Sequence, residues 1–326
     1  MKRREFISGL GGAAIVWPLS AAYAEPAPTV GLLLPWSESD PAAIGYVKAL
    51  REGLARLGWR EGENLKFEQR WTSDEIERTR AYAKELVELR PAVIVAPGPA
   101  FATIREATRT IPIVFALVSD PVGQGFVSSL SHPGGNTTGF MLLEFSAGGK
   151  FVELLKAIAP DTKRVAVFED PTNPTTPQWW RSIEGAARDF DIEPQQALVR
   201  SDRDIDAEIA AIARAPHGSF IVPPQAFLLI HRARLITGAE RERLPAVYWN
   251  PLYVKDGGLL SYGINPATQL ANVATYVDRI LKGAKAGDLP VQAPTKFELL
   301  VNLKTAKALG LTIPEKVIAT ADEVIE

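Results

Sequence analysis

The stretch TVGLLLPWSESDPAAIGYVKALREGLARLG, residues 29–58, contains the unit from which the fold is built. Its apolar start, Thr29–Leu34, predicts a buried strand, and the polar residues after it predict a loop. From Pro41 to Gly58, apolar residues recur at three- and four-residue spacing, which predicts a helix that begins after Asp40 and stops at Gly58. A strand followed by a loop and a helix is the first part of a βαβ unit, in which the next strand lies parallel to the first.

The same alternation of strand and helix patterns runs through the rest of the chain. In its first half we expect strands at 65–71, 92–96, 113–118 and 137–142, and helices at 74–89, 100–109 and, shorter, 125–130. In its second half we expect strands at 164–168, 193–199, 219–222, 246–249, 257–262 and 297–301, and helices at 146–158, 177–190, 204–214, 225–237, 266–282 and 304–309, before a last turn. A chain of 326 residues tends to divide into two domains. The pattern therefore predicts an α/β protein with two doubly wound, parallel-sheet lobes.

Residues 1–24 have the pattern of an export signal. Basic residues at positions 2–4 precede an apolar run that closes on small residues at Ala24, so cleavage is expected before Glu25. Arg3 and Arg4 also resemble the twin-arginine export motif, and an ordinary secretory signal with two arginines stays open as the alternative. The run is shorter, and more broken by glycine, than the roughly 20 apolar residues of a membrane span. We therefore expect a periplasmic protein without direct membrane insertion.

Composition excludes several classes of function. The formal net charge of -2 argues against a nucleic-acid partner. The absence of cysteine excludes disulfides, thiol nucleophiles and thiolate metal sites. The three histidines, His132, His217 and His231, lack the spacing of metal ligands, and neither a G-x-S-x-G elbow nor a Walker loop occurs. We therefore expect no catalytic residue, no metal and no cofactor, although a secreted α/β enzyme stays open.

Candidate ligand-binding residues follow from the positions of the predicted strands. In open parallel sheets, ligands bind outside the carboxyl ends of the strands, where loops meet helix N-termini. The loops of the first half that lie there contribute Trp36, Ser37, Gly98, Pro99, Ser119 and Asp120. Those of the second half contribute Asp170, Asn173, Gln225, Trp249, Asn250 and Tyr262. Many of these loops contain proline, and stiff loops lose less entropy when a ligand binds.

Each candidate also has a purely structural interpretation. Trp36 and Trp249 could provide flat walls for a ligand or belong to the core. Asp120 could cap a helix or reach a ligand amine, and Asn173 could form a turn, as could Asp170. The hydroxyl of Tyr262 could face the cleft or bond to the backbone of a hinge. Trp179 and Trp180, in the middle of a predicted helix, are expected to pack in the core.

Several local phrases resemble one known family. They are EGLARLGWREG (52–62), IPIVFALVSDPVGQG (111–125), HPGGNTTG (132–139), GGLLSYG (257–263), YVDRILKGAKAGDLPVQAPTK (276–296) and FELLVNLKTAKALGL (297–311). In this order they resemble the ABC transporter substrate-binding proteins of the tryptophan- and tyrosine-binding type, a branch of the type I periplasmic binding proteins. The resemblance implies two Rossmann-like lobes joined by a three-segment hinge. It divides the chain into a signal at 1–24, a first lobe at 25–142 plus 264–295, and a second lobe at 143–263 plus 296–326.

The same resemblance implies a function. It implies the periplasmic solute-binding component of an ABC uptake transporter, a monomer that closes on a small-molecule ligand and presents it to an ABC permease. Many relatives carry a small hydroxyl residue where this chain has Pro97, Gly98 and Pro99, and many are lipid-anchored through a cysteine that this chain lacks. The ligand stays open among an aromatic or branched amino acid, an aromatic acid and another small organic anion. A ligand-sensing domain for a membrane receptor is the alternative.

Overall fold

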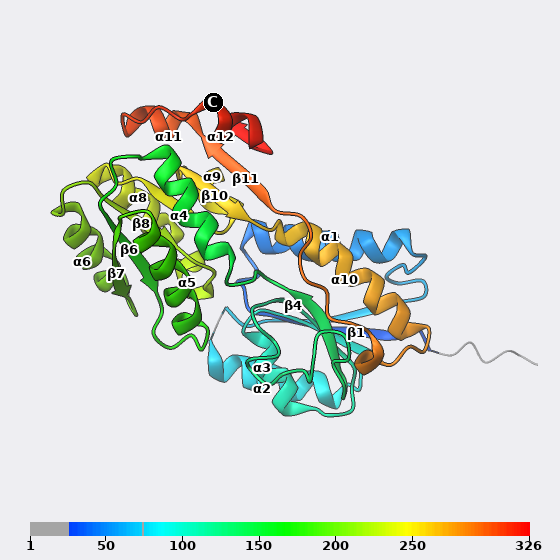
Figure 1. Cartoon of the computed structure of the whole chain (residues 1–326). Coiled ribbons are helices and arrows are strands. Elements are labelled where there is room, and N and C mark those ends of the chain that lie inside the picture. Colours follow the sequence, from blue (N-terminus) through cyan, green and yellow to red (C-terminus); the bar gives the residue numbers. More distant parts are fainter. Residues whose placement is uncertain (1–25, 74) are drawn as a thin grey trace, which may run out of the picture.

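The structure is a computed structural model that describes residues 26–73 and 75–326. The expected export signal lies outside the described residues. Two α/β lobes are each built on one sheet with helices against both of its faces (Figure 1). We use lobe 1 for the sheet of β1 to β5 with α1, α2, α3 and α10, and lobe 2 for the sheet of β6 to β12 with the remaining helices. Among the described helices, none is long and apolar enough to cross a membrane.

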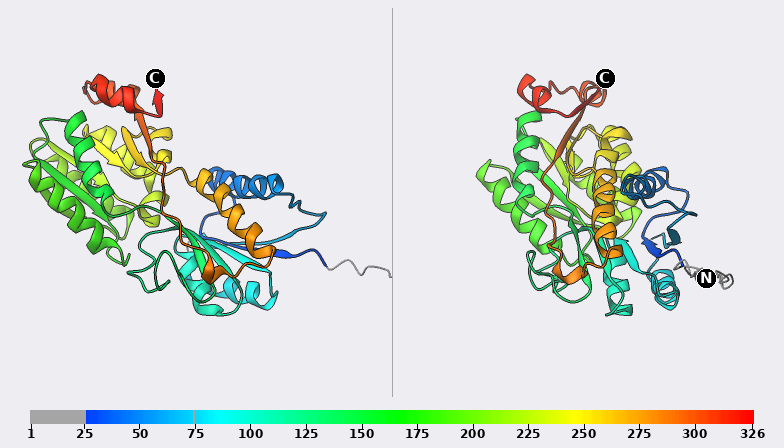
Figure 2. Two further views of the ribbon diagram at one scale, coloured as in Figure 1. Left: turned by 45° about the vertical axis from the view of Figure 1, so that its right-hand side comes forward. Right: turned by 90° about the vertical axis from the view of Figure 1, so that its right-hand side faces the viewer.

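Lobe 1 has five parallel strands in the order β2-β1-β3-β4-β5. Its strands are β1 (Thr29–Leu34), β2 (Lys66–Trp71), β3 (Val93–Pro97), β4 (Ile113–Val118) and β5 (Thr137–Met141), and its helices are α1 (Pro41–Arg56), α2 (Ile76–Glu88), α3 (Ala100–Ala107) and α10 (Pro266–Leu281). Helices α1 and α10 lie side by side on one face of the sheet (Figure 2). Gly53 allows this approach, because a Cβ atom there would lie 2.7 Å from the carbonyl oxygen of Ala271 on α10.

Lobe 2 has seven strands in the order β12-β11-β10-β9-β8-β6-β7, all parallel to their neighbours except for the antiparallel pair β10 and β11. Its strands are β6 (Arg164–Glu169), β7 (Glu193–Leu198), β8 (Gly218–Val222), β9 (Ala246–Tyr248), β10 (Leu260–Gly263), β11 (Glu298–Asn302) and β12 (Glu323–Ile325). Its helices are α4 (Ala147–Ile158), α5 (Thr176–Asp189), α6 (Asp202–Ala213), α7 (Ala226–Ile230), α8 (Arg232–Glu242), α9 (Pro251–Lys255), α11 (Leu303–Ala308) and α12 (Glu315–Thr320).

Successive residues of a strand point to opposite faces of the sheet, so they belong to the hydrophobic cores on its two faces, as expected for a sheet covered on both sides. In β1, Leu32 and Leu34 belong to the cluster under α1 and α10, whereas Leu33 belongs to the cluster under α2 and α3. The fold class expected from the sequence, two doubly wound α/β lobes, is confirmed.

The chain passes between the two sheets three times: after β5, after β10, and in the segment that leads from the short 3-10 helix Ala286–Asp288 to β11. The third segment first runs beside β5, where Met141 N–H donates to Gln292 O (2.8 Å) and Gln292 N–H donates to Gly139 O (2.9 Å). The lobe boundaries given above remain our proposal for how the chain divides.

Four details of secondary structure differ from expectation. No helix forms at 125–130 within the described residues; a series of turns forms instead, in which Gly125 has φ +67° and Phe126 N–H donates to Pro121 O at 2.8 Å. The expected helix at 225–237 is divided into α7 and α8, because the backbone leaves helical geometry at His231. The short helix α9 was not expected, and neither α12 nor β12 was expected in the last turn.

Candidate functional site

Lobe 1 presents an aromatic pair near the carboxyl end of β1. Trp36, directly after the strand, lies 5.3 Å from Tyr46 of α1 between ring centroids, in an edge-to-face arrangement. The Asp40 carboxylate accepts a hydrogen bond from Ala42 N–H (2.9 Å) and so begins α1 in this position. Ser37 is exposed, and its hydroxyl lies 2.9 Å from that of Ser39. Trp36 is only partly buried, which leaves ring surface accessible.

The loops after β3 and β4 contain residues with unusual backbone conformations. Gly98 has φ +53° and open space around it, and Pro99 after it is exposed. Asp120 has φ +44°, and its carboxylate accepts a hydrogen bond from Gly123 N–H (2.8 Å), so it caps a turn and not a helix. Ser119 is buried, and its backbone carbonyl accepts from the Gln124 side chain. The Asp120 side chain therefore has a structural role within its own loop.

The corresponding loop after β6 in lobe 2 is held by its own hydrogen bonds. The Asp170 carboxylate accepts from both the N–H and the hydroxyl of Thr172, and the Asn173 side-chain oxygen accepts from both groups of Thr175. Gln225, which is buried, connects this loop to the loop after β8. Its side-chain oxygen accepts from Asp170 N–H and its amide donates to the Thr176 hydroxyl (3.1 Å).

The two lobes meet where α1 faces the end of β9. Asn250 is fully buried, and its side-chain oxygen accepts from Leu252 N–H (2.9 Å) at the start of α9. Leu252 itself packs against the core of lobe 1. Burial and the Asp40 charge raise the pKa of the Tyr46 hydroxyl, whereas the Arg232 charge and the neighbouring Asn250 amide lower it. Tyr46 of lobe 1 thus lies next to Asn250 of lobe 2 and within the electrostatic range of Arg232.

At this junction, several buried polar atoms have no hydrogen-bond partner of normal geometry among the described residues, although the Asn250 amide is close enough to Tyr46 to lower the pKa of its hydroxyl. They include the Tyr46 hydroxyl, the Asn250 amide nitrogen and, one residue before it, the Trp249 indole nitrogen. A buried donor without a partner costs about 1–3 kcal/mol. Trp249 is itself almost completely buried in the core of lobe 2. Such atoms are suited to accept a partner from a bound molecule.

Tyr262 lies at the hinge. Its ring stacks on Phe297 of the third connecting segment, with a centroid distance of 5.5 Å and an interplanar angle of 14°, and meets Phe151 of α4 edge-on. Burial raises the pKa of its hydroxyl, with opposite smaller effects from Lys150 and Glu153 of α4. The ring thus packs at the hinge, whereas both roles expected for its hydroxyl, in the cleft or on the hinge backbone, stay predictions.

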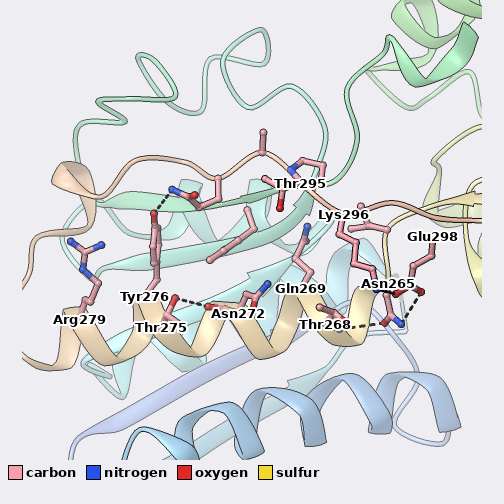
Figure 3. A pocket seen from close by; sticks show the side chains of 15 residues that line it. Asn265, Thr268, Gln269, Asn272, Thr275, Tyr276, Arg279, Thr295, Lys296 and Glu298 are labelled. Atoms are coloured by element: carbon pink, nitrogen blue, oxygen red, sulfur yellow. Dashed lines mark hydrogen bonds and ion pairs between the residues drawn. The ribbon is translucent and has the colours of Figure 1, made fainter. Parts of the chain in front are cut away.

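A separate groove of about 420 Å³ lies between α10 and the third connecting segment (Figure 3). Its walls include Asn272 and Arg279 on the helix and Thr295 and Lys296 on the segment, with Phe140 of β5 beneath. None of the residues expected to bind ligand lines this groove. The groove therefore does not coincide with the loops at the carboxyl ends of the strands.

Glu169, the last residue of β6, is a buried acid that the sequence did not single out. One side-chain oxygen accepts from the Gln196 amide (3.0 Å), and the other has no partner within the described part of the chain. Burial raises the pKa of this carboxyl to about 7, which the Gln196 hydrogen bond opposes. In residues 26–73 and 75–326, no group of three or more acidic or histidine side chains is placed to hold a metal ion.

The structure thus brings Trp36, Tyr46 and Asn250 to one junction, while Asp170, Asn173 and Gln225 bond mainly to one another. Sequence reasoning missed Tyr46, which lies on a helix and not in a loop. Tyr46 had a signal: it follows the helix cap Asp40 by fewer than two turns, and first turns of helices that follow strands lie near the ligand edge of a parallel sheet.

Two α/β lobes, connected three times and meeting at the ends of their strands, define the type I periplasmic binding protein fold. A conserved domain protein from Vibrio cholerae has this structure with a TM-score of 0.85 and 28% identity, over 92% of this chain and 100% of that one. An ABC domain from Streptococcus pneumonia, solved in complex with L-Trp, has a TM-score of 0.85 and 24% identity over the same shares of the two chains.

The family follows from the sequence match. The family model described as ABC transporter substrate binding protein matches residues 38–325, and this chain belongs to that family. A curated relative, the tyrosine-binding protein of Clostridioides difficile (strain R20291), is 24% identical over 274 residues, which are 83% of this chain and 77% of the relative. The resemblance stated from the sequence is confirmed at the level of the family, whose members bind solutes and are not enzymes.

Proposed function

We propose that this chain is the periplasmic solute-binding component of an ABC uptake transporter and that it captures a small aromatic amino acid or a related organic anion between its lobes. Family membership supports the transport role. The names of two relatives, a tyrosine-binding protein and a domain solved with L-Trp, support an aromatic ligand.

The observation that carries the proposal is the junction of Tyr46 and Asn250. The hydroxyl of one and the amide nitrogen of the other are buried side by side, close enough for the Asn250 amide to lower the pKa of the Tyr46 hydroxyl, and neither makes a hydrogen bond of normal geometry within the described residues. An amide nitrogen is a donor only, so a ligand carboxylate or carbonyl satisfies it. The half-buried ring of Trp36, next to Tyr46, offers a flat apolar surface to an aromatic ligand.

Hinge closure is the mechanism that we propose for capture. Three segments connect the lobes, and a ligand that contacts both lobes stabilises the closed arrangement relative to the open one. In this proposal the closed form is what the permease of the transporter recognises. No bond of the ligand is broken, so the binding energy is used only to shift the population of conformations.

Thermal unfolding with added ligand tests the proposal directly. The probes are L-tryptophan, L-tyrosine, L-leucine and an aromatic acid that lacks the amino group. A ligand at one hundred times its dissociation constant stabilises the protein by about 2.7 kcal/mol. We expect an aromatic probe to raise the melting temperature and L-leucine to have less effect. If none of the probes changes the melting temperature, the proposed ligand class is wrong.

Asn250→Asp tests whether the junction binds the ligand. Aspartate keeps the oxygen that caps α9 but loses the amide donor and adds negative charge, so we expect affinity for an aromatic amino acid to fall more than about tenfold. Asn302→Asp is the matched control, because Asn302 caps α11 in the same way, distant in sequence from the junction. Equal affinities of the two variants would contradict the role given to Asn250.

Export is tested by cell fractionation. The full chain is expected in the periplasmic fraction, without the residues before Glu25. Replacing Arg3 and Arg4 by lysine distinguishes the two export routes: loss of export supports the twin-arginine route, and unchanged export supports the general secretory route. Retention of the unprocessed chain in the cytoplasm would contradict the periplasmic assignment.

A further inference from the structure

Leu117 in β4 has a backbone conformation that leucine rarely adopts. Its φ is +56°, in the left-handed region, and the pairing of β4 with β5 shifts register between Phe115 and Val118. Such conformations persist only where surrounding interactions hold them, and they concentrate at functional sites. Leu117 is the residue two positions before Ser119, at the ligand edge of the lobe 1 sheet.

The interaction that holds Leu117 comes from a buried glutamine on α10. The side-chain oxygen of Gln269 accepts a hydrogen bond from Leu117 N–H at 2.8 Å. Its amide nitrogen donates to the carbonyl of Met141, the last residue of β5, at 2.7 Å. Figure 3 shows Gln269 extending from α10 toward the strands. One side chain therefore fixes the distorted part of β4 and the end of β5 together.

Both ends of this connection lie next to segments that join the lobes. The chain leaves lobe 1 directly after Met141, and it returns to lobe 1 at the start of α10, one turn before Gln269. The side chain of Leu117 packs against the core of lobe 1 and also against that of lobe 2. Leu117 is thus a point of contact between the lobes, and its backbone N–H is bound by Gln269.

We propose that Gln269 is a positioning residue for hinge closure: by holding Leu117 in its left-handed conformation and by binding the end of β5, it sets the resting angle between the lobes. This inference rests on the proposed function, because the capture of a ligand between the lobes depends on the angle between them. Without Gln269, β4 relaxes toward regular strand geometry, Leu117 turns away from lobe 2, and the interlobe angle is less narrowly defined. Apparent affinity then falls, because a smaller fraction of molecules is competent to bind.

The test measures the angle without any ligand. Because the chain contains no cysteine, Lys84→Cys on α2 and Asp189→Cys on α5 introduce one spin label in each lobe at exposed positions. Pulsed electron paramagnetic resonance then gives the distribution of distances between the lobes. In Gln269→Leu, which loses both hydrogen bonds, we expect a displaced distribution or one about twice as wide as in the parent chain. Gln269→Glu keeps the acceptor for Leu117 N–H, so we expect its distance distribution to be intermediate between those of the parent chain and Gln269→Leu.

Two controls separate positioning from stability. Asn272→Ala removes an exposed amide from the same helix, and Leu86→Ala destabilises lobe 1 by emptying part of the α2 core, away from the hinge. Both are expected to keep the parent distance distribution. A parent-like distribution in Gln269→Leu, or equal broadening in Leu86→Ala, would overturn the proposal.

Leu117→Gly provides a second route if Gln269→Leu does not fold. Glycine adopts positive φ without strain and keeps the N–H, but it lacks the side chain that contacts lobe 2. We expect a broadened distance distribution in Leu117→Gly and no further broadening when Gln269→Leu is added. Additive broadening would contradict the proposal that Gln269 acts on the interlobe angle through Leu117. A chain that binds none of the four probes contradicts the proposed ligand class, whereas the distance measurement, made without ligand, is unaffected by that failure.

Discussion

The loop after β6 and the junction around Asn250 are both polar and both lie at the carboxyl ends of lobe 2 strands, yet their side chains are used differently. In the loop, Asp170 and Asn173 bond to neighbouring groups of the same lobe, as does Gln225 from the loop after β8. At the junction, the Asn250 amide and the Tyr46 hydroxyl lie next to each other, but neither makes a hydrogen bond of normal geometry within the described residues. Side chains of the first kind give a loop its shape, whereas those of the second kind are available to a ligand. Four substitutions test this distinction.

Gln225→Leu is expected to have the largest effect. It removes the acceptor of Asp170 N–H and the donor to Thr176 while leaving these buried groups in place, so the free energy of unfolding should fall by about 3 kcal/mol. Chemical denaturation measures the change. Affinity for ligand should change much less than stability; a variant of normal stability that loses binding would place Gln225 among the ligand contacts.

Glu169→Gln tests a residue that is only half paired. Burial raises the pKa of the folded protein's carboxyl to about 7, above its ordinary 4.5, so the native state binds more protons than the unfolded state between these values. Stability contributed by the protonated carboxyl is therefore lost as pH rises from 4.5 to 7. The variant should lack this loss and be more stable than the parent by about 2 kcal/mol at pH 8. Chemical denaturation at pH 5 and pH 8 measures the stability of the variant relative to the parent. The same difference in stability at both pH values would contradict a raised pKa for Glu169.

Tyr46→Phe tests the unpaired side of the comparison. Because the buried hydroxyl has no ordinary hydrogen bond, its removal should leave the free energy of unfolding unchanged or slightly higher. Affinity for an aromatic amino acid should fall about tenfold, equivalent to about 1.4 kcal/mol. Calorimetric titration measures the affinity. A loss of stability with unchanged affinity would reverse the interpretation of this residue.

Asn173→Ala is expected to have the smallest effect. Its side-chain oxygen accepts from the N–H and hydroxyl of Thr175 just before α5, where water can replace it because the residue is partly exposed. We expect a decrease of about 0.5–1 kcal/mol in the free energy of unfolding and no change in affinity. Ligand titration of this variant is a sensitive check, because any large change in affinity would place Asn173 in the site.

Most strands were predictable because they are compact apolar runs, whereas the edge strands β2 and β7 are polar and β12 was not expected. Thr29–Leu34 and Ile113–Val118 have the predicted bounds, and the buried strands alternate between the cores on the two faces of a sheet. The long helices were predictable in position but not always in rotation. The apolar spacing of α1 included Ile44, which is 50% exposed, whereas Tyr46 is among the buried residues of the helix. The packing of α10 against α1, which joins segments more than 200 residues apart, decides this rotation and is invisible in local sequence.

The site was less predictable, because a sequence gives residue types but not which of their polar atoms remain unpaired. Asp170 and Asn250 looked alike as loop residues, and only their partners in space distinguish them. Gln269 did carry a signal: it continues the buried spacing of Val273, Tyr276 and Ile280 along α10. A glutamine in an apolar helix stripe must find hydrogen bonds inside the protein, and that requirement predicts a structural connection before its partners are known.

The third connecting segment also protects the rim of lobe 1. Where Gln292 runs beside Phe140 and exchanges backbone hydrogen bonds with Gly139 and Met141, it covers β5, which is the outermost strand of its sheet. An uncovered edge strand presents unpaired backbone groups with which a strand of another molecule can pair, and aggregation often begins in this way. The segment that connects the two lobes thus also hinders aggregation on this side of lobe 1.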